Sequence, residues 1–250
     1  MVLRVMKDIQ SQLDHRRINI KKVGVKTISY PITVLDKARK SQRTVATVNM
    51  YVNLPHHFKG THMSRFVEIL NRFHGRIDLE SFHQILEEMK ARLDAEAAHL
   101  EMSFDYFLLH DHRQEGLKAA CYPCRMHGSL HTSDELEFEF ATPIALPYKE
   151  RLASGLPRSP GRWGTATVAV RFRRFVWIED LITLVQEAVG QEQKLFDDVQ
   201  GFSVESLTRS VGRRLSEQSA IKWFSVNVEN LAEGYSTFAA MQSGNPVVCV

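Results

Sequence analysis

The sequence predicts an α+β protein made of two similar modules, in each of which helices cover one face of an antiparallel sheet. Two observations lead to this prediction. Segments in which apolar and polar residues alternate, as in strands, are interleaved with segments whose apolar residues recur every three or four positions, as in helices. The order strand, helix, helix, strand also occurs twice along the 250 residues, which indicates a repeated unit.

The first module is expected within residues 1–145, which include an N-terminal extension. An alternating, β-branched segment at Arg43–Leu54 predicts a strand. A helix follows, and its apolar stripe comprises Met63, Phe66, Val67, Leu70 and Phe73. A second helix is expected from the N-cap residue Asp78 through Leu100, with a core face of Leu79, Phe82, Leu86, Met89 and Leu93. Three strands complete the module, at 103–110, 117–123 and 135–144.

A loop rich in proline, glycine and arginine, residues 146–164, separates the modules. The second module is expected over residues 165–242. Its elements are a strand at 165–177, helices at 178–190 and 203–217, and strands at 221–230 and 234–242. The tail, residues 243–250, is expected to be loosely held.

Composition narrows the class of protein. The net charge is only +3, and a nucleic-acid-binding protein usually concentrates its basic residues far more. No apolar run approaches the roughly 18 residues of a membrane span, and the N-terminal segment lacks the apolar core of a signal peptide. Three cysteines, an odd number, do not suit a disulfide framework, so we expect a cytoplasmic protein without nucleic acid or membrane partners.

Five segments resemble the type IB GTP cyclohydrolases in order and spacing. They are INIKKVGVKTISYPITV, VATVNMYVNLPHHFKGTHMSRFVEIL, AHLEMSFDYF, RRFVWIEDLI and IKWFSVNVEN. The resemblance implies the bimodular tunnelling fold (T-fold), in which subunits join their sheets into a barrel, so a homo-oligomer such as a dimer or tetramer is expected. It also implies conversion of GTP to dihydroneopterin triphosphate at a divalent metal, in sites formed between subunits.

The stretch KGTHMSRF lies where the first helix is expected to begin. Its candidate side chains are Lys59, His62, Ser64 and Arg65. Free backbone N–H groups at a helix start, together with basic side chains, suit a phosphate chain. The alternative is that the basic residues are solvated or pair with nearby acids while Met63 and Phe66 pack in the core.

The chain departs from the family where the resemblance implies metal ligands and a catalytic histidine. Leu146, Pro147 and Tyr148 stand at the family's Cys-Pro-Cys positions, and Pro160 stands where a ligating histidine would be. A segment that supplies an acidic ligand is shortened, and Ala232–Thr237 replaces the segment with the catalytic histidine. The last histidine of the chain is His131, so no shift of alignment restores the two histidines.

Leucine and proline side chains cannot ligate a metal, so the family site is expected to hold no ion, and ordinary metal-dependent GTP cyclohydrolase activity is predicted to be absent. Three functions stay open. The first is a repurposed enzyme that acts on a purine, pterin or other small anionic metabolite. The second is a non-catalytic relative that senses nucleotide or assembles with a true cyclohydrolase. The third is a genuine cyclohydrolase with a relocated metal.

The remaining cysteines and histidines are bunched in a C-x2-C-x2-H-x3-H string formed by Cys121, Cys124, His127 and His131. These residue types ligate zinc, and short spacings of this kind occur in zinc sites. A zinc ion is therefore one hypothesis for this string. The other is a hairpin with polar histidines and a small buried cysteine.

The loop before the second module carries Arg158, Arg162 and Trp163. Guanidinium groups bind carboxylates or phosphates and an indole stacks on a flat ring, so these residues are candidates for a rebuilt ligand pocket. The alternative is a solvated loop with a packed indole.

Tyr148 and Tyr235 fall at or beside the positions where the family's catalytic residues are lost. A phenol at such a position can serve as an acid or base, and the alternative is that it only packs. Glu233 lies next to the position of a substrate-holding glutamate implied by the resemblance.

Overall fold

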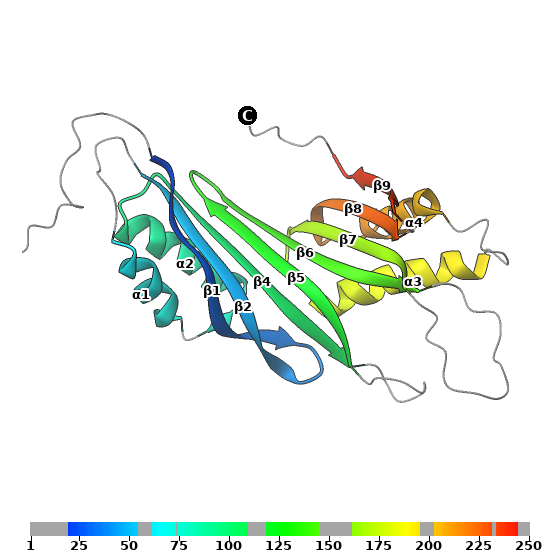
Figure 1. The fold of residues 1–250 in the computed structure, drawn as a ribbon, viewed down its shortest axis with the longest axis horizontal. Helices are drawn as coiled ribbons and strands as arrows, with labels where there is room; N and C mark the ends of the chain where they lie inside the picture. The colour runs from blue at the N-terminus through cyan, green and yellow to red at the C-terminus, as the bar shows by residue number, and fades with distance from the viewer. Residues whose placement is uncertain are drawn as a thin grey trace, which may run out of the picture. The chain divides into compact units, whose positions relative to one another are not determined.

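A computed structural model describes residues 20–54, 62–73, 75–109, 119–145, 162–195, 203–231 and 234–244. These residues form two compact units (Figure 1). The first unit extends to Asp105 and includes Arg125–Leu136, and the second unit comprises Tyr106–Cys124 and the chain from Glu137 onward. The boundary falls within three strands, so these strands contribute residues to both units.

The first unit contains a sheet with the strand order β3-β1-β2-β4. Strand β1 pairs antiparallel with β2, which pairs antiparallel with β4, and β3 pairs parallel with β1 at Thr33 and Val34. Two helices, α1 and α2, lie side by side next to these strands (Figure 1). The bounds are β1 Ile20–Asp36, β2 Lys40–Leu54, α1 Ser64–Arg72, β3 Arg76–Ile77, α2 Leu79–Arg92 and β4 Ala97–Leu109.

Alternation along β2 and β4 determines which face of this sheet is covered. From Ala46 onward the even-numbered residues of β2 are buried, as are those of β4 from Ala98 to Phe104; they comprise Ala46, Val48, Met50, Val52, Leu54, Ala98, Leu100, Met102 and Phe104. The helices contribute Phe66, Ile69, Leu70, Phe82, Ile85, Leu86 and Met89 to the same core. Because side chains alternate across a strand, the odd-numbered residues, which are mostly polar, lie on the face without helices.

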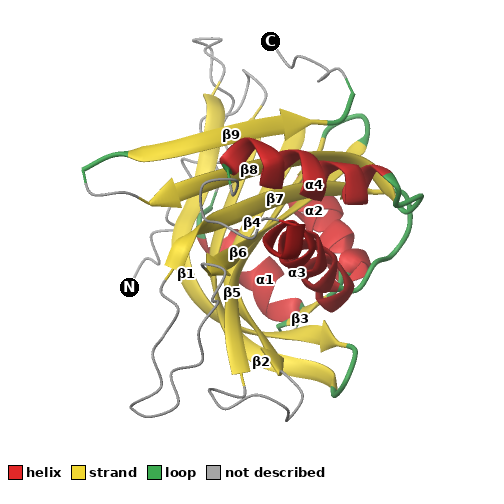
Figure 2. Ribbon diagram, turned by 90° about the vertical axis from the view of Figure 1, so that its right-hand side faces the viewer, coloured by secondary structure: helices red, strands yellow, loops and turns green. Residues whose placement is uncertain are grey.

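The second unit contains the strand order β6-β7-β8-β9, with antiparallel pairing throughout. Helix α4 lies over β8 and β9, and α3 packs beside α4 (Figure 2). The bounds are β6 Asp134–Ala145, β7 Arg162–Phe172, α3 Ile178–Leu195, α4 Val204–Ser216, β8 Ile221–Leu231 and β9 Ser236–Gln242. Strand β5, Ala119–Leu130, lies between β4 and β6 in the strand order. The predicted α+β fold with antiparallel sheets and helix pairs on one face is confirmed.

Some predicted details were wrong. The second helix ends at Arg92 rather than Leu100, because Asp94 adopts a left-handed conformation (φ 49°) that stops a helix; Ala97–Leu100 instead begin β4. In α1, Met63 and Val67 are each 41% exposed, so the core face is narrower than the predicted stripe. Strand β7 begins at Arg162, inside the expected loop.

The second helix of each unit begins with the same local structure. Asp78 accepts a hydrogen bond from the backbone N–H of Ser81, whose hydroxyl bonds back to the backbone of Asp78. Ser203 and Ser206 form the same reciprocal pair at the start of α4. Each such capping box satisfies backbone N–H groups that the helix itself cannot, and a capping residue of this kind stabilises by about 1 kcal/mol. The recurrence supports the repeat of element order.

Candidate functional site

The start of α1 carries three described candidates for anion binding, His62, Ser64 and Arg65; Lys59 lies outside the described residues. The backbone N–H of Arg65 donates to the His62 carbonyl (3.1 Å), and that of Phe66 donates to the Met63 carbonyl (3.2 Å). These two N–H groups are therefore already hydrogen-bonded. Anion binding by the side chains at this helix start stays a prediction.

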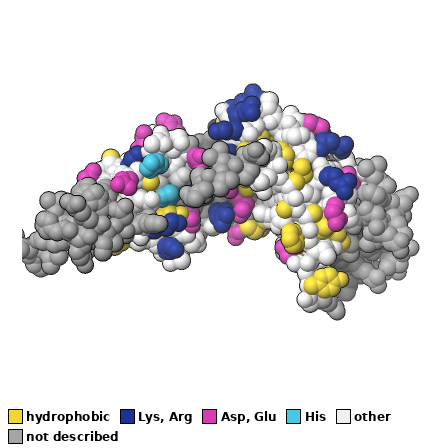
Figure 3. Space-filling view, turned by 90° about the horizontal axis from the view of Figure 1, so that it is seen from above, with side chains coloured by type: hydrophobic (Ala, Val, Ile, Leu, Met, Phe, Trp, Pro, Cys, Tyr) yellow, Lys and Arg dark blue, Asp and Glu magenta, His cyan; other side chains and the backbone are white. Residues whose placement is uncertain are grey.

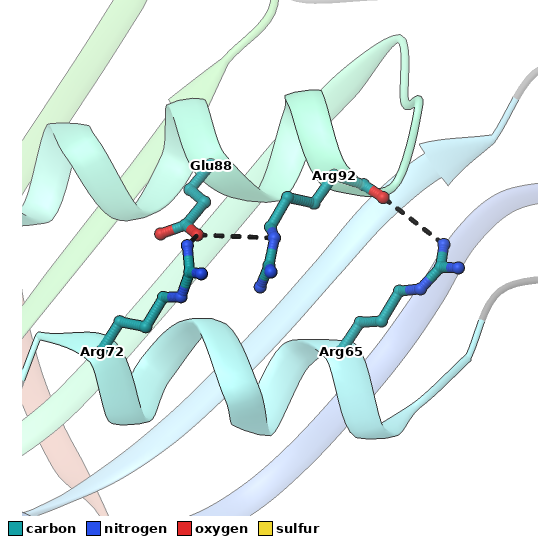
Figure 4. A network of polar contacts seen from close by, with 4 residues as sticks. All are labelled: Arg65, Arg72, Glu88 and Arg92. Atoms are coloured by element: carbon teal, nitrogen blue, oxygen red, sulfur yellow. Dashed lines mark hydrogen bonds and ion pairs between the residues drawn. The ribbon is translucent and has the colours of Figure 1, made fainter.

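The guanidinium of Arg65 points to the C-terminal end of the neighbouring helix α2 (Figure 4). Its Nη1 lies 3.5 Å from the carbonyl oxygen of Arg92, where a cation interacts favourably with the last carbonyls of a helix. On the same surface, Glu88 pairs with Arg72 of α1 and lies 3.5 Å from Nε of Arg92. In this structure Arg65 thus links α1 to α2 through a backbone carbonyl.

The candidates of the second unit cluster at one end of its sheet. Strand pairing places Ala145 opposite Arg162, Gly164 opposite Asn230, and Leu231 opposite Ser236. Two candidate aromatic residues flank these pairs: Trp163 is half-buried and Tyr235 is 68% exposed.

Several other candidates adjoin these strand ends in the sequence. Tyr148 follows Ala145, and Glu233 lies between Leu231 and Ser236 in the sequence. Tyr148, Arg158, Glu233 and the side chain of Arg162 lie outside the described residues.

The four residues of the cysteine–histidine string are not brought together. Cys121, Cys124 and His127 lie along the extended strand β5, with His131 just after it. At about 3.3 Å per residue, Cys121 and His127 are roughly 20 Å apart, and Cys124 points to the opposite face and is buried, with its thiol donating to the Tyr122 carbonyl. No group of three or more His, Cys, Asp or Glu among the described residues could hold a metal ion. A zinc site using all four residues of one chain is incompatible with this strand.

A polar cluster that the sequence reasoning missed lies on the helix-free face of the first unit. Tyr51 of β2 is only 7% exposed, and its ring stacks on that of His99 in β4, with centroids 4.8 Å apart. Lys22 of β1 lies 4.6 Å from the centroid of the same ring. The Tyr51 hydroxyl donates to Oε1 of Glu101, and Nδ2 of Asn49 donates to Oε2, both at 3.0 Å.

We call these residues, with Arg125 and His127 of β5, the Tyr51 cluster. Arg125 and His127 are close enough to Glu101 to act on its charge. One sequence signal could have revealed the cluster: Asn49 and Tyr51, like His99 and Glu101, are spaced by two residues in alternating segments. Two adjacent strands then align them on one face, with Tyr51 directly opposite His99.

The cluster shifts the pKa values of its members. Burial raises the pKa of Tyr51 to about 12, and the hydrogen bond to Glu101 acts in the same direction. Partial burial lowers the pKa of His99, and His127 and Lys22 lower it further, so this imidazole is neutral at neutral pH. Burial acts to raise the pKa of Glu101, but hydrogen bonds from Asn49 and Tyr51 outweigh it, so the net pKa is below the usual value.

The second unit contains a smaller arrangement of the same type. Arg171 of β7 forms an ion pair with Glu137 of β6 (3.2 Å), and its guanidinium carbon lies 5.0 Å from the ring centroid of Trp223 in β8. Each unit therefore places a cation, an aromatic ring and a carboxylate together on its sheet.

Charge on the rest of the surface is mixed. Basic and acidic side chains are interspersed on the face drawn in Figure 3. Within the described ranges, every helix is too short or too polar to cross a membrane. The interspersed charges agree with the small net charge of +3.

The fold is that of urate oxidases. The structure superposes on a highly active mutant of Bacillus sp. TB-90 urate oxidase with a TM-score of 0.61, covering 90% of this chain and 100% of that chain at 8% identity. It matches uricase from Arthrobacter globiformis with a TM-score of 0.59, over 92% of this chain and 95% of that chain at 9% identity. Such low identity shows the fold alone, and it confirms the predicted tunnelling fold.

Sequence comparison shows the family. The protein-family model described as type I GTP cyclohydrolase FolE2 matches residues 6–195 of this chain. GTP cyclohydrolase FolE2 from Syntrophobacter fumaroxidans is 42% identical over 95% of this chain and 99% of that protein. The protein of the same name from Syntrophus aciditrophicus is 43% identical over 90% of this chain and 94% of that protein. The chain belongs to the FolE2-type GTP cyclohydrolase family.

Proposed function

We propose that this protein binds GTP and catalyses a GTP cyclohydrolase reaction. The observation that supports the proposal is the 42% identity to a relative named GTP cyclohydrolase FolE2 over nearly the full length of both chains. The comparisons give no support to a repurposed chemistry. GTP as the ligand also agrees with the sequence-based expectation of an anionic small molecule.

The family's metal does not fit the residues present. Leu146, Pro147 and Tyr148 offer no thiolate, and the chain has no histidine after His131. In the parts of the chain that the structure describes, the His, Cys, Asp and Glu side chains form no group able to hold an ion. We therefore derive no catalytic step through a metal, and we expect turnover to be independent of added Mn²⁺ or Zn²⁺.

The experiment incubates the purified full-length chain with GTP, in EDTA and with added Mn²⁺ or Zn²⁺, and measures both GTP binding and formation of dihydroneopterin triphosphate. Product formation in EDTA is the expected result. Product only with metal would contradict the metal-independent mechanism, and absence of GTP binding would contradict the proposed function itself. Binding without product under every condition favours a second candidate, a non-catalytic nucleotide sensor, to which the loss of metal-binding side chains also points.

A matched pair of variants locates the binding site. Trp163→Ala removes the half-buried indole at the sheet end of the second unit. Stacking of a base on an aromatic side chain contributes about 1–3 kcal/mol, so GTP binding should weaken roughly tenfold. Trp223→Ala removes an indole that contacts Arg171 instead, and it should bind GTP as the wild type does.

We further propose that the chain assembles with copies of itself through its sheet edges. In the described sheet, β9 pairs only with β8, and its Phe238 is 70% exposed. The described part of β1 is covered by β3 only at Thr33 and Val34. Open edges invite strand pairing, and pairing between subunits would remove them.

The assembly is tested by light scattering coupled to size-exclusion chromatography. Phe238→Lys places a charge on the β9 edge, so the oligomer should dissociate. Val45→Lys changes a residue of β2 that is likewise exposed and should leave the oligomer intact. A monomeric wild type, or a Phe238→Lys variant of unchanged mass, would rule out assembly through this edge.

A further inference from the structure

The Tyr51 cluster lies on four adjacent strands, β1, β2, β4 and β5. Its side chains share the helix-free face, because the opposite residues of β2 and β4 are buried in the core. Neighbouring strands lie about 4.8 Å apart, so the four strands span roughly 14 Å across this face.

Both carboxylate oxygens of Glu101 already accept hydrogen bonds, from Tyr51 and from Asn49. Lys22, which lies over the Tyr51 ring, and Arg125, which lowers the pKa of Glu101, are the cationic side chains of the cluster.

Tyr51 keeps this arrangement in place. Its ring is held between Lys22 and His99, and its hydroxyl is bonded to Glu101. Arg125 at the rim is exposed, as is Lys22. The cluster therefore combines an aromatic platform with two exposed cationic side chains, and charge-assisted hydrogen bonds from such side chains commonly bind oxyanions.

We propose that the Tyr51 cluster is an anion-binding site for a phosphate group, separate from the residues we assign to GTP turnover. Lys22 and Arg125 supply the charge, and the imidazoles of His99 and His127 supply further N–H donors. A metal ion is not the ligand, since the described His, Cys, Asp and Glu side chains form no group that could hold one. The phosphate comes either from an inorganic ion or from a nucleotide.

Acidification should tighten the site. The groups that act on His99 are His127, Lys22 and His131, which lower its pKa, and Glu101, which raises it. Because its pKa is lowered in the folded protein, His99 is neutral at neutral pH and gains a positive charge only as the pH falls through that lowered value. A bound anion favours the charged imidazole, so anion affinity should rise over the same interval.

The test is isothermal titration of the full-length protein with sodium sulfate, a phosphate analogue whose charge does not change between pH 5 and pH 8. We expect saturable binding of one sulfate per chain, several-fold tighter at pH 5.5 than at pH 7.5. Arg125→Ala and Lys22→Gln should each weaken binding about tenfold, which corresponds to roughly 1.4 kcal/mol. His99→Gln should reduce the pH dependence while retaining binding at pH 7.5.

Arg213→Ala is the matched control, since Arg213 is an exposed arginine on α4 of the other unit. This variant should bind sulfate as the wild type does. Circular dichroism establishes that each variant is folded. Titrations with GTP and with guanosine distinguish the two sources: competition of GTP, but not guanosine, with sulfate identifies a nucleotide phosphate, and lack of competition identifies an inorganic ion.

Two results would overturn the proposal. One is the absence of saturable sulfate binding to the wild type at either pH. The other is sulfate binding that is the same in Arg125→Ala and Lys22→Gln as in Arg213→Ala, because the anion would then lie elsewhere.

Discussion

Replacing Phe82 by alanine is expected to lower the free energy of unfolding by about 3–5 kcal/mol, the range for a buried phenylalanine. Phe82 is 1% exposed on the core face of α2. Its ring fills the space above Gly128 of β5: a Cβ atom placed on Gly128 would lie 2.3 Å from Cε1 of Phe82 and 3.1 Å from Cδ1 of Leu86. Since Gly128 offers no side chain to fill the gap, the cavity would persist.

The measurement is equilibrium unfolding in guanidinium chloride, and Val67→Ala on the exposed side of α1 is the control, with a loss well below that of Phe82→Ala. A double-mutant cycle sharpens the test. Gly128→Ala alone should destabilise by about 1–3 kcal/mol through overpacking, and by less when Phe82→Leu has already shortened the ring. Strict additivity of the two changes would show that Phe82 and Gly128 do not share this space.

Replacing Tyr106 by phenylalanine should lower the free energy of unfolding by about 1.5–3 kcal/mol, the range for a hydrogen bond to a charged group. Tyr106 of β4 is fully buried, and its hydroxyl donates to Oε1 of Glu179 at 2.5 Å. Glu179 lies in the first turn of α3 and is itself buried. Removing the hydroxyl leaves a buried carboxylate oxygen without this donor, and its desolvation cost is then no longer offset.

Thermal and chemical unfolding of Tyr106→Phe would measure this loss. Tyr235→Phe removes the same hydroxyl from an exposed tyrosine and should change stability by less than about 0.5 kcal/mol. If Tyr106→Phe were as stable as Tyr235→Phe, the hydrogen bond between β4 and α3 would contribute nothing to the folded state.

Local sequence patterns predicted most of the fold. The strand predicted at 135–144 corresponds to β6, in which Phe138 and Phe140 alternate with glutamates and are buried. Asp78 was recognised as an N-cap because aspartate is favoured there. The end of α2 was missed because helical periodicity continues past Arg92, whereas the left-handed conformation of Asp94 does not follow from its residue type alone.

The candidate site was less predictable. The sequence pattern of α1 alone suggested that Arg65 contacts a phosphate chain. In the structure Arg65 contacts the carbonyl of Arg92, which belongs to another helix. The Tyr51 cluster was missed for a related reason. Its members come from segments as far apart as Lys22 and Arg125, and only strand pairing brings them onto one face.

By itself, the amino-acid sequence determined the class of fold and the family, because these depend on residue type and on spacing along the chain. The tertiary structure alone decided which polar groups meet. It spread the four residues of the cysteine–histidine string along one strand, and it stacked Tyr51 between Lys22 and His99. Contacts between distant segments follow from register and packing, which local patterns do not specify.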